Sequence, residues 1–440
     1  MCIRDSITTC LNPRLAIKSP AWAGWVVVLF FLVQVAGCKN RRASNGVAQA
    51  VVVGDSMAPN LLGEHQNRVC SACGFKIVSE VVDPTRRFVV CPNCGSRVTI
   101  EGACLTDPAT EVALKVGQLP TRWQVIGFQR PDDQQASIKR VIGLPGEKVW
   151  FENGNVFLQT QNAEPKLLKK DWAQQKATRV LVHDNQFQDQ GSRWVPLAPV
   201  SRLTGAVPQR FETEDRRWLR YQPRRCYEHT LGQSWTPRIE DAYGFNQGVS
   251  RQLNSVNEVC VEFEFDPTAK SFQDSQSELL VAIVVGEQTH LVRFAFEGDS
   301  VEVQLFGRDQ KLTAVTRCQI GRQRVVCGVS NIDQQIIVVV GEKQICSIDL
   351  AEHGSADPVE LLLSLRPSNP VDVKRVRLWR DVYYFSSVSR NELLQRQAGV
   401  AGAEGYFVVG DNLPVSQDSR FWLRPRVEAT DILGVVDIGQ

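Results

Sequence analysis

The stretch VVVGDSMAPN, Val51 to Asn60, places a serine directly after a run of valines. Valines favour a strand, and the glycine, aspartate and proline that follow are typical of a turn. Ser56 is therefore expected at a strand end, as an ordinary turn residue or as a presented nucleophile. The nearest histidine is His65, and the chain has 5 histidines in all. A nucleophilic Ser56 would thus need another kind of base.

A candidate base lies in IKRVIGLPGE, Ile138 to Glu147. Lys139 and Arg140 stand between apolar residues of an expected strand, and strand alternation directs Lys139 away from its two neighbours. Such a lysine is either a snorkelling edge residue or a buried amine. Burial disfavours the charged form and lowers the lysine pKa, so a buried Lys139 could take the proton of Ser56 near neutral pH.

A third stretch, GYFVVGDNLPVSQDSRFW, runs from Gly405 to Trp422. Its apolar run ends in Gly-Asp-Asn, and a turn and Ser-x-Asp-Ser-Arg follow. Taken alone, Ser416 is most simply a turn residue. Asp418 and Arg420 are most simply an ion pair that braces a loop.

Apolar alternation predicts a mainly β chain. Residues 123–128 and 138–142 are expected to pair as a hairpin, and the Asn153-Gly154 turn predicts a second hairpin. Between roughly 200 and 392, runs such as CVEFEF, ELLVAIVV and QIIVVV alternate with turns about every ten residues, which predicts a β-sandwich. This region interrupts the first β region, which resumes at Tyr406.

Three stretches, taken in chain order, resemble the boxes of bacterial type I signal peptidases, which are serine endopeptidases with a Ser/Lys dyad. The stretches are GDSMAP, IKRVIGLPGE, and GDN followed by Ser-x-Asp-Ser-Arg. The stretch WQVIGFQRP looks like the strand before the lysine box of that family. Repressor-type self-cleaving proteases share the first two boxes loosely and lack the third, so the third box favours the signal peptidases.

The resemblance implies a role for each matching residue. Ser56 would be the nucleophile and Lys139 the general base. Ser416 would hydrogen-bond the lysine amine, and Asp418 and Arg420 would brace the loop that carries it. The backbone N–H of Ser56 would donate to the oxyanion. No cofactor is implied for the catalysis.

The same resemblance gives three supporting residues. Gly54 stands where some members carry a serine that adds an oxyanion donor, so that donor is absent here. Met57 would line the site beside the membrane, and Arg140 is a supporting residue next to the base. The box around Trp123 lacks the usual Gly-Asp pair, and Leu413–Pro414 replaces more polar residues. Neither departure touches an implied catalytic group.

Four cysteines form two Cys-x-x-Cys pairs, each followed by glycine: Cys70, Cys73, Cys91 and Cys94. Four thiolates at this spacing suit tetrahedral Zn²⁺ in a structural site, because no position is left open for water. Two disulfides are the alternative in an oxidising compartment. The segment would clamp the chain between Ser56 and the next strand or touch a partner. Some signal peptidases carry a similar cysteine-rich insert after the serine box.

The stretch AWAGWVVVLFFLVQVAG, Ala21 to Gly37, has Gln34 as its one polar residue. It has the length of a short transmembrane helix. Its end, VQVAGC, also resembles a lipoprotein cleavage box with Cys38 as the lipid-bearing residue. Either interpretation tethers the chain to a membrane. The first six residues, MCIRDS, resemble a translated sequencing adaptor rather than part of a gene.

Charge and composition limit the remaining possibilities. The chain has 50 Lys and Arg against 48 Asp and Glu, a net charge of +2, which argues against a general nucleic-acid-binding surface. The sandwich region resembles a lectin- or laminin-G-like jelly roll, a likeness that does not give a function. Four of its cysteines could pair in disulfides: Cys260, Cys318, Cys327 and Cys346.

The expected fold is mainly β, with a signal-peptidase-type catalytic domain, an N-terminal anchor, a zinc-ribbon insert and an inserted jelly-roll-like sandwich. The expected segments are 1–20 (undefined N-terminus), 21–37 (anchor), 47–66, 101–200 and 393–440 (catalytic), 67–100 (zinc ribbon) and 201–392 (sandwich).

The expected function is removal of signal peptides, after small residues, from exported preproteins. It would take place at the extracytoplasmic face of a bacterial inner membrane, with no nucleic-acid partner. The alternative is a catalytically inactive surface protein that binds a glycan or partner through the sandwich.

Overall fold

The computed structural model describes residues 41–44, 47–83, 85–100, 105–130, 132, 135–161, 163–187, 192–197, 217–226, 234–236, 238–266, 277–285, 288–307, 311–321, 323–350, 359–365, 373–398 and 404–437. The expected anchor at 21–37 and Cys38 lie outside these residues. Within them, no helix is both long and apolar enough to cross a membrane. The chain divides into two compact units, Met1–Gln34 and Val35–Gln440, and every described residue belongs to the second.

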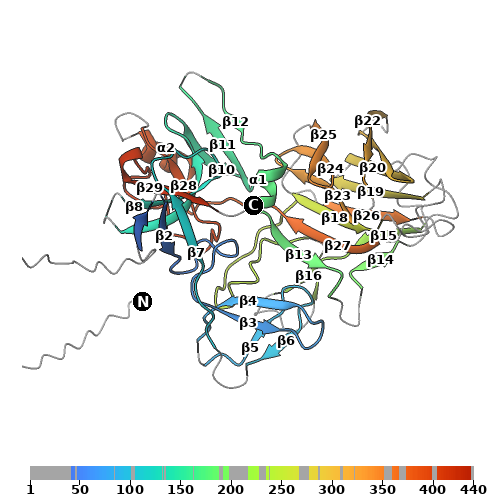
Figure 1. Cartoon of the computed structure of the whole chain (residues 1–440), viewed down its shortest axis with the longest axis horizontal. Coiled ribbons are helices and arrows are strands. Elements are labelled where there is room, and N and C mark those ends of the chain that lie inside the picture. Colours follow the sequence, from blue (N-terminus) through green and yellow to red (C-terminus); the bar gives the residue numbers. More distant parts are fainter. Residues whose placement is uncertain are drawn as a thin grey trace, which may run out of the picture. The chain divides into compact units, whose positions relative to one another are not determined.

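A seven-stranded sheet carries the three motif stretches (Figure 1). Its strand order is β1-β2-β7-β29-β8-β9-β28. The bounds are Arg41–Ser44 (β1), Val47–Val51 (β2), Glu111–Lys115 (β7), Ile432–Asp437 (β29), Val125–Gln129 (β8), Ala136–Gly143 (β9) and Phe407–Val409 (β28). A 3-10 turn, Ala429–Asp431 (η4), leads into β29. The expected β8–β9 hairpin is present, although its first strand begins at Val125 because Trp123 has a φ of 69°.

The sheet is apolar on both faces. Val125 and Val436 pack in one cluster with Val52, whereas their chain neighbours Ile126 and Val435 pack in another with Trp422. Burial on both sides explains why β9 is buried along its whole length, Lys139 and Arg140 included.

A three-stranded sheet adjoins this core: Lys148–Glu152 (β10), Asn155–Gln159 (β11) and Lys166–Leu167 (β12). The predicted turn at Asn153-Gly154 is confirmed, and both residues have positive φ, 52° and 87°. The helix Arg390–Ala398 (α2) packs on β10, where the Gln397 side chain bonds both backbone groups of Val149.

The cysteine-rich segment consists of two small hairpins. His65–Val69 (β3) pairs with Lys76–Glu80 (β4), and Phe88–Val90 (β5) pairs with Arg97–Thr99 (β6). Each hairpin carries one Cys-x-x-Cys pair at its turn. The segment begins at His65, before the expected start at residue 67, because β3 already pairs with β4 there.

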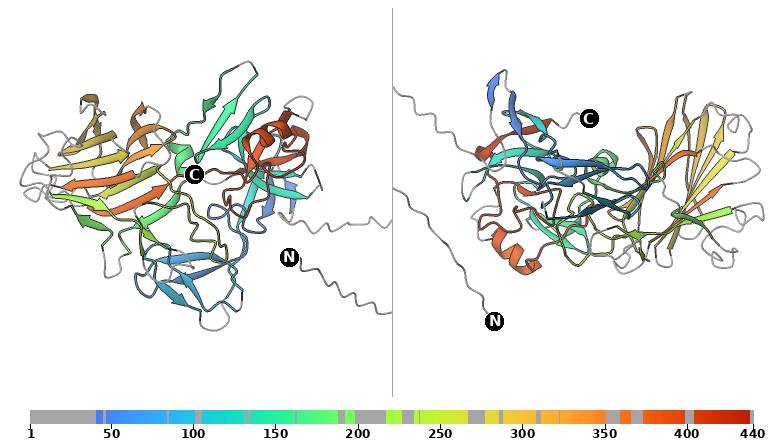
Figure 2. Two further views of the ribbon diagram at one scale, coloured as in Figure 1. Left: turned by 180° about the vertical axis from the view of Figure 1, so that it is seen from behind. Right: turned by 90° about the horizontal axis from the view of Figure 1, so that it is seen from below.

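Two large antiparallel sheets form the predicted sandwich and share one apolar core (Figure 2). The first has the order β13-β27-β18-β23-β24-β25 and the second β14-β15-β26-β19-β20-β21-β22. The bounds are Val180–Asp184 (β13), Val373–Arg380 (β27), Val259–Phe265 (β18), Val325–Ile332 (β23), Gln335–Val340 (β24), Lys343–Asp349 (β25), Trp194–Pro196 (β14), Arg217–Tyr221 (β15), Val359–Leu365 (β26), Ser277–Val285 (β19), Gln288–Glu297 (β20), Ser300–Phe306 (β21) and Leu312–Gln319 (β22).

The expected start of the sandwich at residue 201 is too late. The strands β13 and β14 already hydrogen-bond to β27 and β15, so the sandwich takes chain from residue 180 onward. The helix Trp172–Thr178 (α1) leads into it, and a small pair, Arg224–Arg225 (β16) and Ser234–Trp235 (β17), lies between its strands in sequence. The four sandwich cysteines are all unpaired, so the disulfides considered from sequence are absent among the described residues.

Candidate active site

Ser56 lies in the turn that follows β2, as the valine run predicts. Gly54 begins this turn with a φ of +75°, a conformation that side chains other than glycine rarely adopt. Asn412 holds the turn from outside. Its backbone N–H donates to the Ser56 carbonyl (3.0 Å), and its side-chain amide donates to the Asp55 carbonyl (2.9 Å).

The amine of Lys139 lies 2.6 Å from the hydroxyl oxygen of Ser56. This is the distance of a hydrogen bond between a nucleophile and its base. Lys139 is only 5% exposed, and this burial lowers its pKa from 10.5 to about 8. The negative charge of Asp418 opposes that shift, and the positive charge of Arg130 adds to it. About a tenth of the amine is therefore neutral at pH 7, and about half at pH 8.

A small cavity of about 40 Å³ opens beside this pair. Its lining residues come from the serine turn and from β9: Val52, Val53, Ser56, Met57, Ser137, Ile138 and Lys139. Met57 does line it, but the side chain is 1% exposed and packs in the core with Leu61 and Ile138. Met57 thus lies beside the nucleophile, and the sheet core holds most of its side chain.

Asp418 and Arg420 form a fully buried ion pair, with Nε–Oδ1 at 2.8 Å and Nη2–Oδ2 at 2.9 Å. Arg420 also donates to the carbonyls of Leu413 (2.9 Å) and Ser416 (3.3 Å). Asp418 accepts from the Gly410 amide at 3.0 Å. Burial alone would raise the pKa of Asp418, but the charge and hydrogen bonds around it outweigh burial and hold the pKa below 3.8. The pair thus ties together both ends of the loop.

Ser416 lies in this loop, and the expected hydrogen bond to the lysine amine is absent among the described residues. The Ser416 hydroxyl is buried without a partner of ordinary hydrogen-bond geometry. It lies close to Asp418 and helps to lower the pKa of that carboxylate. The bond to the lysine amine is missing because the loop backbone fixes the position of Ser416. The Ser416 N–H donates to the Asn412 carbonyl, and the Ser416 carbonyl accepts from Arg420. The lysine amine bonds Ser56 instead.

Arg140 points to another part of the same loop. Its guanidinium makes two bonds of 2.6 Å to the carboxylate of Asp411, and both side chains are almost wholly buried. It also donates to the Trp123 carbonyl at 2.7 Å. Arg140 therefore joins β9 to the Gly-Asp-Asn segment on the side away from the serine.

Two backbone features near Ser56 are available to a bound peptide. The strand β28 pairs with β9 only from Arg140 onward, so the outer edge of Ala136–Lys139 has no strand partner among the described residues. In the same part of the chain, none of the described hydrogen bonds uses the backbone N–H of Ser56.

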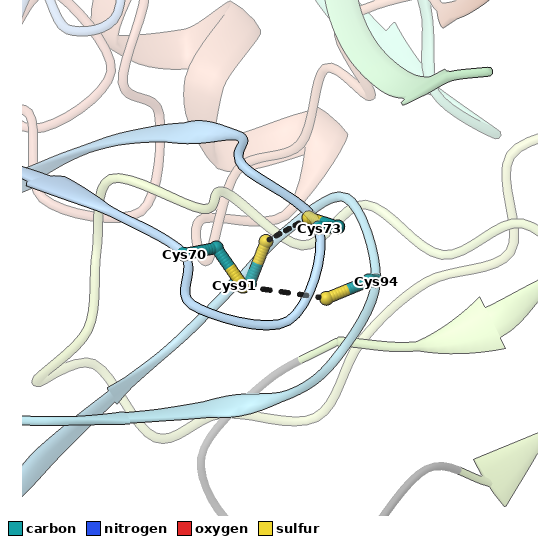
Figure 3. A group of neighbouring side chains, drawn as sticks. All are labelled: Cys70, Cys73, Cys91 and Cys94. Atoms are coloured by element: carbon teal, nitrogen blue, oxygen red, sulfur yellow. Dashed lines mark hydrogen bonds between the residues drawn. The ribbon is translucent and has the colours of Figure 1, made fainter. Parts of the chain in front are cut away.

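The four cysteines of the two knuckles converge on one point (Figure 3). The Cys70 and Cys94 sulfurs are 3.6 Å apart, and those of Cys73 and Cys91 are 3.8 Å apart. All four sulfurs lie within 4.8 Å of one another. These separations are far longer than a disulfide bond of about 2.05 Å, and the cysteines are unpaired.

Sequence reasoning missed three residues that position the site: Asp411, Asn412 and Gly410. All three belong to the Gly-Asp-Asn box, which the sequence marked as a whole without separate roles. Gly410 passes so close to Ser416 Oγ and the Ser56 carbonyl that a Cβ there would clash with both. Only this distant contact makes the glycine necessary, so the box gave no signal for its separate role.

Comparison with known families supports a signal peptidase relationship. Residues 22–200 match the family model described as signal peptidase, peptidase S26. The match covers fewer than half of the 440 residues and includes the serine turn, the cysteine-rich segment and β9. A search of curated proteins finds no relative.

Solved structures resemble the chain only weakly. Sheep galectin-11 in complex with glycerol has 13% identity and a TM-score of 0.20, covering 29% of this chain and 94% of its own. The CBM40 of the Ruminococcus gnavus IT-sialidase, bound to α2,3-sialyllactose, has 13% identity and a TM-score of 0.20, covering 32% and 82%. The CBM2 module of the evolved Dit of Lactobacillus casei BL23 phage J-1 has 7% identity and a TM-score of 0.24, covering 38% and 71%. Scores this low carry no argument about function.

Proposed function

We propose that this chain is a membrane-anchored serine endopeptidase of the signal peptidase type, which removes signal peptides from exported preproteins. The observation that carries the proposal is the 2.6 Å contact between the Ser56 hydroxyl and the buried Lys139 amine. The match of residues 22–200 to the signal peptidase family supports the same reaction class. The anchor would be the apolar segment 21–37, which puts the reaction at the membrane surface.

In this mechanism Ser56 Oγ attacks the carbonyl carbon of the scissile bond while its proton passes to the neutral amine of Lys139. The C–O bond forms, and the carbonyl electrons move onto the oxygen. The backbone N–H of Ser56 donates to that oxyanion. Gly54 has no side chain to add a second donor, as expected from sequence.

Collapse of the tetrahedral intermediate breaks the C–N bond, and the protonated Lys139 gives its proton to the leaving amine. Water then enters, Lys139 takes a proton from it, and the ester to Ser56 is hydrolysed. The enzyme returns to its starting state with one peptide bond cleaved and one water consumed.

The substrate would bind as an extended strand beside Ala136–Lys139, where β9 has no partner on its outer edge. The cavity of about 40 Å³ would receive a small side chain next to the scissile bond. A small cavity beside the nucleophile is consistent with cleavage after small residues. The proposed partner is therefore an unfolded segment of a preprotein rather than a folded surface.

The test is cleavage of a preprotein by the purified full-length chain in detergent. Ser56→Ala and Lys139→Met should each abolish cleavage, while Ser347→Ala and Lys343→Met should retain it, because Ser347 and Lys343 are exposed on β25 of the sandwich. Cleavage that survives Ser56→Ala or Lys139→Met would contradict the dyad. An inactive wild-type protein that binds glycans saturably would instead favour the alternative role of the sandwich.

A further inference from the structure

The second cysteine knuckle is built into the rest of the protein. The Asn93 side chain, between Cys91 and Cys94, donates to the carbonyls of Asp184 (3.3 Å) and Phe187 (2.6 Å) and accepts from the Asp184 amide at 2.8 Å. Asn93 is 2% exposed. In the first knuckle, by contrast, the two residues between the cysteines are exposed.

The four sulfurs have the separation that a tetrahedral zinc ion requires. A Zn–S bond of about 2.3 Å corresponds to a tetrahedron edge of about 3.8 Å. The observed pairs, Cys70 with Cys94 and Cys73 with Cys91, lie at 3.6 and 3.8 Å. Four thiolates without a carboxylate or open position form a donor set for a structural ion rather than for a reacting one.

One loop, Tyr243–Gly248, lies directly against this knuckle; we call it the bridging loop. The Gln247 side chain accepts from the Val90 amide (2.9 Å) and donates to the Val90 carbonyl (3.1 Å), one residue before Cys91. Gly244 packs so closely on Pro92 that a Cβ would clash. The Phe245 carbonyl accepts from the Glu80 amide of β4 at 3.1 Å.

The opposite side of the bridging loop holds the candidate active site. The amides of Asn246 and Asn412 form a reciprocal pair with two bonds of 2.7 Å. Asn412, fully buried, is the residue that bonds the Asp55 and Ser56 carbonyls. Tyr243 adds a bond of 3.2 Å to the Asp411 carbonyl. A continuous set of contacts thus joins the knuckle to the serine turn.

We propose that the four cysteines bind one Zn²⁺ and that the metal-loaded knuckle fixes the bridging loop, which positions the serine turn through Asn246. Without the metal, the two knuckles lose the link between their four sulfurs, and the surface on which Gln247 and Gly244 pack loosens. The metal then sets the rate of peptide cleavage without touching the substrate. The activity part of this proposal rests on the proposed function.

The experiment combines metal analysis with two variants of the full-length protein. Wild type should hold one zinc per chain, and Cys91→Ser should lose it. Asn246→Ala should keep the zinc yet lower kcat about tenfold, as expected when a hydrogen-bonded pair that positions a reacting group is removed. Cys346→Ser removes a thiol from the sandwich and should change neither zinc content nor kcat.

The double variant Cys91→Ser with Asn246→Ala should be no slower than the slower single variant, because both changes break the same connection. If the kcat losses of the two single variants multiply in the double variant, the connection through Asn246 is wrong. A wild-type chain without zinc, with a mass four hydrogens lower than that of the reduced chain, would reveal two disulfides and overturn the metal site.

Hydrogen exchange separates this proposal from the peptidase function. Removal of zinc by a chelator should speed exchange in residues 409–416 and in the bridging loop, and added Zn²⁺ should restore the slow rate. This result would support the connection even if the wild-type chain cleaved no preprotein. Unchanged exchange in 409–416 after complete zinc removal would overturn it, whatever the activity.

Discussion

The pKa of Lys139 fixes how cleavage should depend on pH. Only the neutral amine can take the proton of Ser56, and burial lowers the pKa from 10.5 to about 8. About 9% of the amine is then neutral at pH 7 and about 91% at pH 9. The kcat/KM for a preprotein peptide should therefore rise about tenfold between these pH values and level off above pH 9.

Initial cleavage rates from pH 6 to pH 10.5, measured on protein checked to stay folded, provide the assay. An amine with the ordinary pKa of 10.5 would instead give a rise of about a hundredfold from pH 7 to pH 9 and no plateau. Such a profile, or a rate that does not change with pH, would refute the argument that burial prepares Lys139 as the base.

The same shift has a consequence for stability with a definite sign. Because the folded-state pKa lies below the unfolded one, the unfolded chain binds more protons between about pH 8 and 10.5, and stability rises with pH in that window. The lowering of the pKa from 10.5 to about 8 corresponds to about 3 kcal/mol in the free energy of unfolding. Wild type should lose about this much relative to Lys139→Met as the pH falls from 10.5 to 8. If denaturant unfolding gives the same difference in free energy between wild type and Lys139→Met at both pH values, the charge is not buried.

Three substitutions test the scaffold around the serine. Gly410→Ala places a Cβ against Ser416 and the Ser56 carbonyl, so we expect a loss of about 1–3 kcal/mol in denaturant unfolding and slower cleavage. Asp411→Asn leaves Arg140 buried without its charge partner and should cost about 3–5 kcal/mol, whereas Arg140→Met with Asp411→Leu should recover part of the loss. Gly54→Ala meets no atom within 4 Å but must adopt a φ of +75°, so its cost should be about 1 kcal/mol and purely conformational.

The sequence predicted those parts of the site and the fold that depend on residues close together in the chain. The valine run predicted the strand before Ser56. The apolar neighbours of Lys139 allowed a snorkelling edge residue or a buried amine, and the structure shows the buried amine. The Asn153-Gly154 turn and the sandwich strands were predicted because their periodicity and turn residues are local properties.

What the sequence could not give depends on contacts between distant segments. The partner of Arg140 is Asp411, 271 residues away, and no local pattern marks the pair. Ser416 was expected at the lysine amine, but the turn that holds its backbone directs it near Asp418. The sandwich began earlier than expected because β13 is short and is recognisable only through its pairing with β27.

The most direct test is to find where the acyl group forms. A short peptide ester that ends in alanine is mixed with the full-length protein, quenched in acid within the first turnovers and digested for mass spectrometry. The acyl group should be on Ser56, absent from Ser56→Ala, and formed much more slowly in Lys139→Met. An acyl group on any other residue, together with cleavage by Ser56→Ala, would contradict the Ser56–Lys139 mechanism.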